Sequence, residues 1–147
     1  MENQLMNYIV EKTHELIDAS SCCAEAKQAG QSVETFSRQR RYQLLTALAG
    51  QQGRVATAHN LNDNAETVLF YLARGTGLNG LGGIPPVRGQ IIRPLIGCTR
   101  EQIEQFCGEN GLDFIHDSSN DSDQYTRNRI RHHLLPQMQQ LNGQALG

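Results

Sequence analysis

Residues 54–67, RVATAHNLNDNAET, decide the fold, because a β-like run passes directly into an apolar-periodic helix. The run Arg54 to Ala58 predicts a strand. At about 100° per helical residue, His59, Asp63 and Glu66 fall within about 60° of one another. Helices that follow parallel strands begin at the carboxyl edge of the sheet, where α/β proteins bind ligands. We therefore expect this polar face to look into a ligand cleft.

A simpler interpretation of the same stretch is a solvated helix start, in which Asn62 or Asp63 only caps the helix. The apolar positions lie away from the polar face and predict the core side of the helix, which ends near Arg74-Gly75. Those apolar positions are Leu61, Ala65, Val68, Leu69 and Leu72.

Segments before this stretch extend an alternation of strands and helices. Residues 8–16 favour a strand but also fit a helix. Residues 24–29 predict a short helix stopped by Gly30, and Ser32 to Thr35 predict a cap before a helix reaching about Ala49. Such an alternation is typical of an α/β protein with a parallel, doubly wound sheet.

After the helix that ends near Arg74-Gly75, the sequence predicts a connector and further helices. Residues 74–86 are too rich in glycine for regular structure and predict an ordered loop packed over the sheet; a connecting turn is favoured over a phosphate cradle. Residues 91–96 lead to Thr99, which caps a helix over 100–110 ended by Gly111. Residues 117–121 have the composition of a turn.

The last predicted helix covers residues 125–141. Its spacing directs Ile130, Leu134 and Leu135 inward, while Arg127 and Arg131 share another face.

Composition limits the class of protein. With 147 residues and 38% hydrophobic content, the chain forms one globular domain, with or without a helical appendage. We find no signal peptide and no apolar run of about 18 residues, so we expect a cytoplasmic protein without a membrane span. The four cysteines lack ligand spacing and are interpreted as reduced thiols, with metal binding as the alternative. They are Cys22, Cys23, Cys98 and Cys107.

The formal charge is −2, yet the cations cluster. Clusters of this kind bind phosphate, whether of a nucleic acid or of a small anion, although a solvated helix face is the usual alternative. One cluster is Arg38, Arg40 and Arg41, and the other is Arg127, Arg129, Arg131, His132 and His133.

Taken in order, several short motifs resemble the tRNA(Ile)-lysidine synthetase family of PP-loop ATP pyrophosphatases over roughly residues 30–140. Their order and spacing make the combination specific. The motifs are Glu34, Arg38 and Arg41-Tyr42; Ala56-Thr57-Ala58-His59; Asp63-Asn64-Ala65-Glu66-Thr67; Arg74-Gly75-Thr76-Gly77; Arg93-Pro94-Leu95; Asp117-Ser118-Ser119-Asn120; and Tyr125-Thr126-Arg127-Asn128-Arg129-Ile130-Arg131.

The resemblance implies an adenine nucleotide α-hydrolase-like fold and an ATP-dependent ligation of lysine to the wobble cytidine of isoleucine tRNA. In such enzymes ATP adenylates the C2 oxygen of the base and pyrophosphate leaves, after which the lysine ε-amine displaces AMP. ATP with Mg²⁺, lysine and isoleucine tRNA are the implied cofactors and partners.

Several residues acquire expected roles in that reaction. His59 is the cation we expect near the triphosphate, and the resemblance implies that Asp63 and Glu66 help to hold lysine or Mg²⁺, with Asp63 the candidate metal ligand. From the residues alone, the two carboxylates hold an ammonium, orient a hydrated Mg²⁺ or accept a proton from the amine, and these roles stay open.

Arg131 is expected to be a catalytic residue, like His59, Asp63 and Glu66, and with Arg127 it is expected to face phosphate or the adenylated base. Arg127 and Asn128 are assigned to substrate binding. Arg38 and Arg41 either contact tRNA or form structural ion pairs with Glu34.

One departure from the family pattern is the missing S-G-G-x-D-S loop, whose amides and hydroxyls grip the ATP phosphates. We therefore expect an incomplete sheet in a partial nucleotide-binding domain over residues 1–87, and a small helical region on the tRNA side over 88–147. The chain alone is expected to be inactive, and its open sheet edge to be covered by association between chains.

Two hypotheses of different classes follow. The chain is either a truncated lysidine synthetase or a non-catalytic remnant that binds tRNA, nucleotide or another subunit. A tRNA thiolase is a weaker third interpretation, because Cys98 and Cys107 lack the spacing of catalytic cysteines or cluster ligands.

Overall fold

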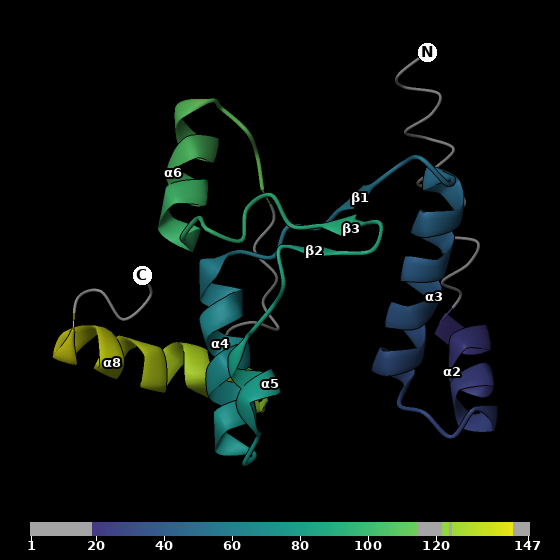
Figure 1. Cartoon of the computed structure of the whole chain (residues 1–147), viewed down its shortest axis with the longest axis horizontal. Helices are drawn as coiled ribbons and strands as arrows, with labels where there is room; N and C mark the ends of the chain where they lie inside the picture. Colours follow the sequence, from purple (N-terminus) through teal and green to yellow (C-terminus); the bar gives the residue numbers. More distant parts are fainter. Residues whose placement is uncertain (1–18, 115–121, 124, 143–147) are drawn as a thin grey trace. The chain divides into compact units, whose positions relative to one another are not determined.

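The computed structural model describes residues 19–114, 122–123 and 125–142 (Figure 1). The chain divides into two compact units, Met1–Val55 and Ala56–Gly147, which are considered separately. The strand predicted over residues 8–16 and the turn predicted over 117–121 lie outside the described residues. The functional division into residues 1–87 and 88–147 stays a prediction.

The first unit contains two helices that contact each other, α2 (Ala19–Gln28) and α3 (Val33–Ala49). Gly30 follows α2 with φ +63°, a conformation that disfavours L side chains, so the helix ends where the sequence predicts. Ser32 caps α3 through its side chain, and Gly50 follows its last turn with φ +66°. Both predicted helices are confirmed, although α2 begins earlier than expected.

Three short strands form one sheet in the order β1–β3–β2 (Figure 1). They are β1 (Val55–Ala56), β2 (Val87–Arg88) and β3 (Ile91–Ile92). The strands β2 and β3 pair antiparallel, with Val87 opposite Ile92, so this pair differs from the parallel arrangement that we expected. The α/β class is confirmed. Association between chains at a sheet edge stays a prediction.

The helix after β1 is α4 (Leu61–Ala73), as the sequence predicts. Its cap is Asn60, because the Asn60 side chain accepts from Asp63 N at 2.9 Å while Asp63 Oδ2 accepts from Asn60 N at 3.0 Å. The cap residue is therefore Asn60, and the simpler interpretation that named Asn62 or Asp63 as the cap is wrong. His59 precedes the cap, so the helical spacing that grouped it with Asp63 does not apply to it.

The glycine-rich connector contains a short helix, α5 (Leu78–Leu81), which its composition argued against. It packs on α4 instead of covering the sheet as predicted. Asn64 on α4 holds the end of the connector, because Asn64 Oδ1 accepts a hydrogen bond from Ile84 N at 2.6 Å. The connector is therefore tied to the same helix turn that carries the polar face.

The next helix, α6 (Arg100–Glu109), begins at the predicted cap. Thr99 Oγ1 accepts from Gln102 N at 3.3 Å, and the Gln102 side chain accepts from Thr99 N at 2.9 Å. Gly111 follows the helix with φ +61°. Both ends of the helix are thus set by local sequence.

The final helical segment is interrupted by a π-turn, in which Leu135 N donates to Ile130 O five residues earlier. Pro136 explains the interruption, because its ring has no N–H and clashes with the carbonyl of the preceding turn. The segment consists of α7 (Thr126–Arg129), η2 (Ile130–Leu134) and α8 (Leu135–Leu141).

The π-turn changes which side chains face inward. Ile130 and Leu135 are buried, as predicted, but Leu134 is 40% exposed and the expectation that it packs inward is wrong. A turn with one extra residue rotates the following helix face, so the regular 3.6-residue spacing fails here.

Two further observations concern the residues that the structure describes. Cys23, Cys98 and Cys107 are free thiols there. No helix in this part of the chain has both the length and the apolar character that a bilayer crossing requires.

Candidate active site

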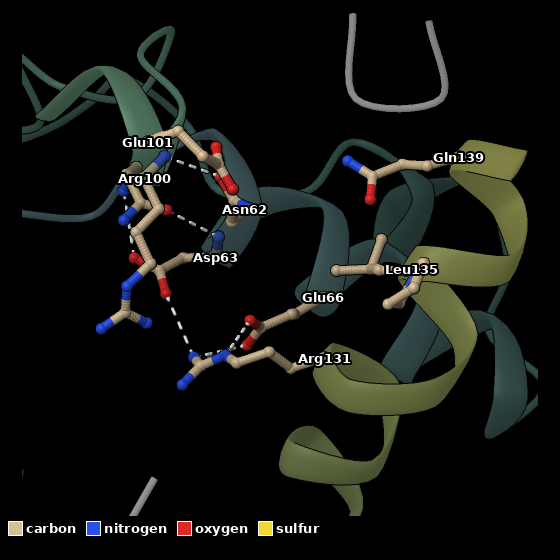
Figure 2. A pocket seen from close by; sticks show the side chains of 10 residues that line it. Asn62, Asp63, Glu66, Arg100, Glu101, Arg131, Leu135 and Gln139 are labelled. Carbon is tan, nitrogen blue, oxygen red and sulfur yellow. Dashed lines mark hydrogen bonds and ion pairs between the residues drawn. The ribbon is translucent and has the colours of Figure 1, made fainter. Parts of the chain in front are cut away.

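Side chains from the start of α4, from α6, from η2 and from α8 line a pocket of about 190 Å³ within the second unit (Figure 2). This volume is many times the roughly 10–15 Å³ that one water molecule needs, so the pocket can hold a small molecule. Its lining residues are Asn60, Asn62, Asp63, Glu66, Arg100, Glu101, Arg131, Leu135, Pro136 and Gln139.

The centre of the pocket is an ion pair between Glu66 on α4 and Arg131 on η2. Arg131 Nε lies 2.5 Å from Glu66 Oε1 and Arg131 Nη2 lies 3.0 Å from Glu66 Oε2, so the pair is bidentate. Glu66 is only 2% exposed. The hydrogen bond with Glu66 raises the pKa of Arg131 against the opposing effect of burial, and the guanidinium stays charged.

Asp63 lies beside this pair, one helical turn from Glu66. Its Oδ1 is 3.7 Å from Arg131 Nη2, and its Oδ2 accepts from Asn60 N. Figure 2 shows both carboxylates directed toward the same guanidinium. The Asp63 side chain is 31% exposed, against 2% for Glu66, so Asp63 is the carboxylate that a ligand in the pocket meets first.

A second wall of the pocket comes from the first turn of α6. Arg100 N donates to Asn62 Oδ1 at 2.9 Å, and Leu61 N donates to Cys98 O at 2.8 Å. These two bonds fasten the start of α6 to the start of α4. Sequence reasoning missed Asn62, Arg100 and Glu101 as site residues, because no local signal joins positions 38 residues apart.

His59 is not among the side chains that line this pocket, so the expectation that it shares one pocket with Asp63 and Glu66 is corrected. Its Nδ1 lies 3.0 Å from Thr57 Oγ1. The physical reason is that α4 begins two residues later, which leaves His59 outside the helix. Its role beside a triphosphate stays a prediction.

Arg127 and Asn128 do not line the pocket either. The Arg127 guanidinium lies 5.8 Å from the centroid of the Phe70 ring, where a cation–π contact joins α7 to α4. Asn128 is buried, and its Nδ2 donates to Ser122 O at 2.6 Å. These contacts are structural, and substrate binding by the two residues stays a prediction.

Arg38 and Arg41 belong to α3 in the first unit. Arg38 lies 5.9 Å from the centroid of the Tyr42 ring, and an ion pair of 3.9 Å joins Arg40 to Glu25. The contact of Arg38 and Arg41 with tRNA stays a prediction.

The carboxylates of the pocket face protein groups in place of a Mg²⁺ ion. Both oxygens of Glu66 bind Arg131, and the oxygens of Asp63 face Asn60 N and Arg131. Within the described residues, no group of three or more His, Cys, Asp or Glu side chains is arranged to hold a metal ion. These donors do not fit Mg²⁺ in this arrangement, and we derive no step through it.

The comparison with known protein families places the chain in a class. The chain belongs to the PP-loop family, whose family model, described as a PP-loop domain, matches residues 2–138.

Among individual proteins, the chain is similar to tRNA(Ile)-lysidine synthases, which confirms the resemblance drawn from the motifs. It is 49% identical over 119 residues to the tRNA(Ile)-lysidine synthase of Thermosipho africanus, covering 80% of this chain and 28% of the relative. The Bacteroides thetaiotaomicron protein of that name is 45% identical over 113 residues, which cover 76% of this chain and 26% of the relative. The Symbiobacterium thermophilum protein of that name is 46% identical over 121 residues, which cover 78% of this chain and 25% of the relative. The chain spans about a quarter of the length of these relatives.

Proposed function

We propose that this chain carries part of the catalytic domain of a tRNA(Ile)-lysidine ligase, which attaches lysine to the wobble cytidine of isoleucine tRNA at the expense of ATP. The observation that carries the proposal is the pocket in which Asp63 and Glu66 converge on Arg131. The names of the relatives supply the reaction. A doubly wound parallel sheet around ATP, Mg²⁺ with the nucleotide and a cytoplasmic location belong to the same proposal.

Each charged residue of the pocket has a separate role in the second step, in which the lysine ε-amine displaces AMP. Glu66 holds the Arg131 guanidinium in one orientation, because a bidentate pair fixes both position and plane. Asp63, more exposed, binds the incoming side-chain ammonium and accepts its proton. The neutral amine then attacks C2 of the adenylated base, and AMP leaves with the former C2 oxygen. The structure thus favours lysine binding by Asp63 over a direct role for Glu66.

The test is lysine-dependent release of AMP from ATP in the presence of isoleucine tRNA. The chain is assayed alone and after addition of a segment that contains S-G-G-x-D-S. We expect release only in the second assay, and we expect Asp63→Asn to lower it by about 100-fold, in the range typical of general acid–base catalysis. Arg88→Gln, an exposed arginine outside the pocket and outside both cation clusters, is the matched control and should leave the rate unaltered.

Two results would contradict the proposal. One is AMP release that does not depend on lysine, and the other is tRNA binding without AMP release in either assay. The latter result would favour the non-catalytic binding protein considered from the sequence.

A further inference from the structure

One aromatic side chain on α4 contacts two arginines that come from separate elements. The Arg74 guanidinium, at the C-terminal end of α4, lies over the Phe70 ring, 5.0 Å from its centroid. Arg127 on α7 lies over the same ring at 5.8 Å. We name these three residues the Phe70 cluster. Contacts between α4 and α7 hold the two arginines at one place in the second unit.

The Phe70 cluster carries positive charge that no protein carboxylate compensates. Neither Arg74 nor Arg127 forms an ion pair among the residues that the structure describes. Both arginines are exposed, whereas Phe70 is half-buried. A guanidinium that stacks on a ring uses its face, so the N–H groups in its plane remain available as hydrogen-bond donors. Donors of this geometry match the oxygens of a phosphate group.

Exposed aromatic rings accompany the two arginines. Tyr71 is 42% exposed and packs edge to face on Phe70, with 6.0 Å between the ring centroids. Tyr125, two residues before Arg127, is 60% exposed. Single-stranded nucleic acids stack their bases on such rings and place their phosphates on neighbouring arginines. A small anion would use the two charges alone, which solvent and salt screen at an exposed site. The surface therefore fits a polynucleotide better than a small phosphate compound.

The Phe70 cluster continues the face of α4 that lines the pocket. Glu66, Phe70 and Arg74 are four residues apart, so they follow one another along one stripe of the helix, about 6 Å per step. In the last helical segment, Arg131 and Arg127 are also four residues apart, and they contact Glu66 and Phe70 respectively. A strand of RNA with one base at the pocket would therefore have neighbouring phosphates at the cluster.

We propose that the Phe70 cluster is a binding site for the RNA backbone, in which Arg74 and Arg127 contact phosphates and Tyr71 stacks on an unpaired base. This inference rests on the proposed function and adds the surface that holds the RNA strand beside the reacting cytidine. These contacts position the RNA and take no part in the chemical steps. Loss of either arginine therefore weakens RNA binding and leaves the rate at saturating RNA unaltered.

Fluorescence anisotropy tests this site with a labelled RNA hairpin that carries the anticodon loop of isoleucine tRNA, titrated with this chain at several salt concentrations. Arg74→Gln and Arg127→Gln should each reduce the slope of log affinity against log salt by about one, the effect of one lost phosphate contact. The double variant should reduce the slope by about two. Replacement of both arginines by lysine keeps the charges and should retain the slope.

Two further variants separate stacking from charge. Tyr71→Leu should lower the affinity by about tenfold at every salt concentration, the loss typical of one stacked base, and leave the slope unaltered. Arg88→Gln removes an exposed arginine of the second unit outside the cluster and is the matched control, with affinity and slope unaltered. Circular dichroism of every variant establishes that it is folded.

The AMP-release assay with the S-G-G-x-D-S segment gives a second readout. The double variant, Arg74→Gln with Arg127→Gln, should raise the KM for RNA and leave kcat unaltered. A lower kcat with an unaltered KM would contradict a positioning role.

Separate readouts distinguish failure of this site from failure of the proposed function. The RNA site is overturned if the unaltered chain does not bind the hairpin, if the double variant keeps its affinity and slope, or if Arg88→Gln loses as much, even where lysine-dependent AMP release supports the proposed function. Weaker binding of ATP or pyrophosphate by the double variant, with unaltered RNA binding, would assign the cluster to a free nucleotide instead. If AMP release is absent while the arginine variants lose RNA affinity as expected, the site stands and only the proposed reaction falls.

Discussion

Arg131 and Glu66, 65 residues apart in sequence, meet in a bidentate ion pair with distances of 2.5 and 3.0 Å. The Glu66 side chain is 2% exposed and the Arg131 side chain is 24% exposed. The buried negative charge of Glu66 is therefore compensated by the positive charge of this arginine. The pair also joins η2 to α4, and the pocket exists where those two elements meet. We therefore expect the ion pair to contribute to the free energy of unfolding.

We expect Arg131→Gln to lower the free energy of unfolding by about 3 kcal/mol, because it leaves a buried carboxylate without its charge partner. Glu66→Gln should cost less, since the arginine is partly exposed. In the double variant the cost should fall below the sum of the two, which urea denaturation of all four proteins measures. Arg129→Gln, on an exposed side chain two residues away, is the control; additive single costs would contradict the coupling.

Gly83→Ala should destabilise the chain by about 1–3 kcal/mol, because Gly83 has φ +62° and an added Cβ would lie 2.2 Å from Asn64 Oδ1. That oxygen accepts the hydrogen bond from Ile84 N, so the connector would move away from α4. Gly97→Ala is the matched control, since nothing lies within 4 Å of its added Cβ. Equal melting temperatures of the two variants would show that the connector is not held in this way.

Asn62→Ala should cost about 1 kcal/mol, because Arg100 N loses its acceptor at the start of α6. Asn62→Asp keeps an acceptor oxygen and should restore the lost stability, which urea denaturation measures. An Asn62→Asp variant as unstable as Asn62→Ala would show that this oxygen does not hold the start of α6.

Asp123 provides a test at acidic pH. His133 Nε2 and His132 Nδ1 lie 2.6 and 2.7 Å from its two oxygens, and these hydrogen bonds lower the pKa of Asp123 below the ordinary value of 3.8. A depressed carboxyl pKa stabilises the folded chain above the ordinary pKa, and this contribution is lost as the pH falls through the lowered value. The carboxyl carbon resonance of Asp123 should therefore titrate below pH 3.8.

The variant His132→Ala with His133→Ala should return the Asp123 titration to its ordinary range. A midpoint at or above 3.8 in the unaltered chain would show that the two histidines do not hold this carboxylate.

Local sequence determined most of the helices, because a helix end depends on groups within about four residues of one another. The caps at Ser32 and Thr99 and the left-handed glycines at 30, 50 and 111 could all be predicted. The helix α4 begins at Leu61 instead of at His59, and that shift of two residues is enough to remove His59 from the predicted polar face. Pro136 is a local signal for the π-turn. The regular helical spacing of the apolar residues in this segment nevertheless led to the prediction of one continuous helix.

The sequence by itself determined the family and the carboxylate-bearing face of α4, since motif order and a spacing of three residues between Asp63 and Glu66 are local properties. Only the tertiary structure decided which cation faces those carboxylates, and that Asn62 brings the α6 turn beside them. A contact between residues 38 or 65 positions apart is selected by packing and by the need to compensate buried charge, which no local spacing encodes.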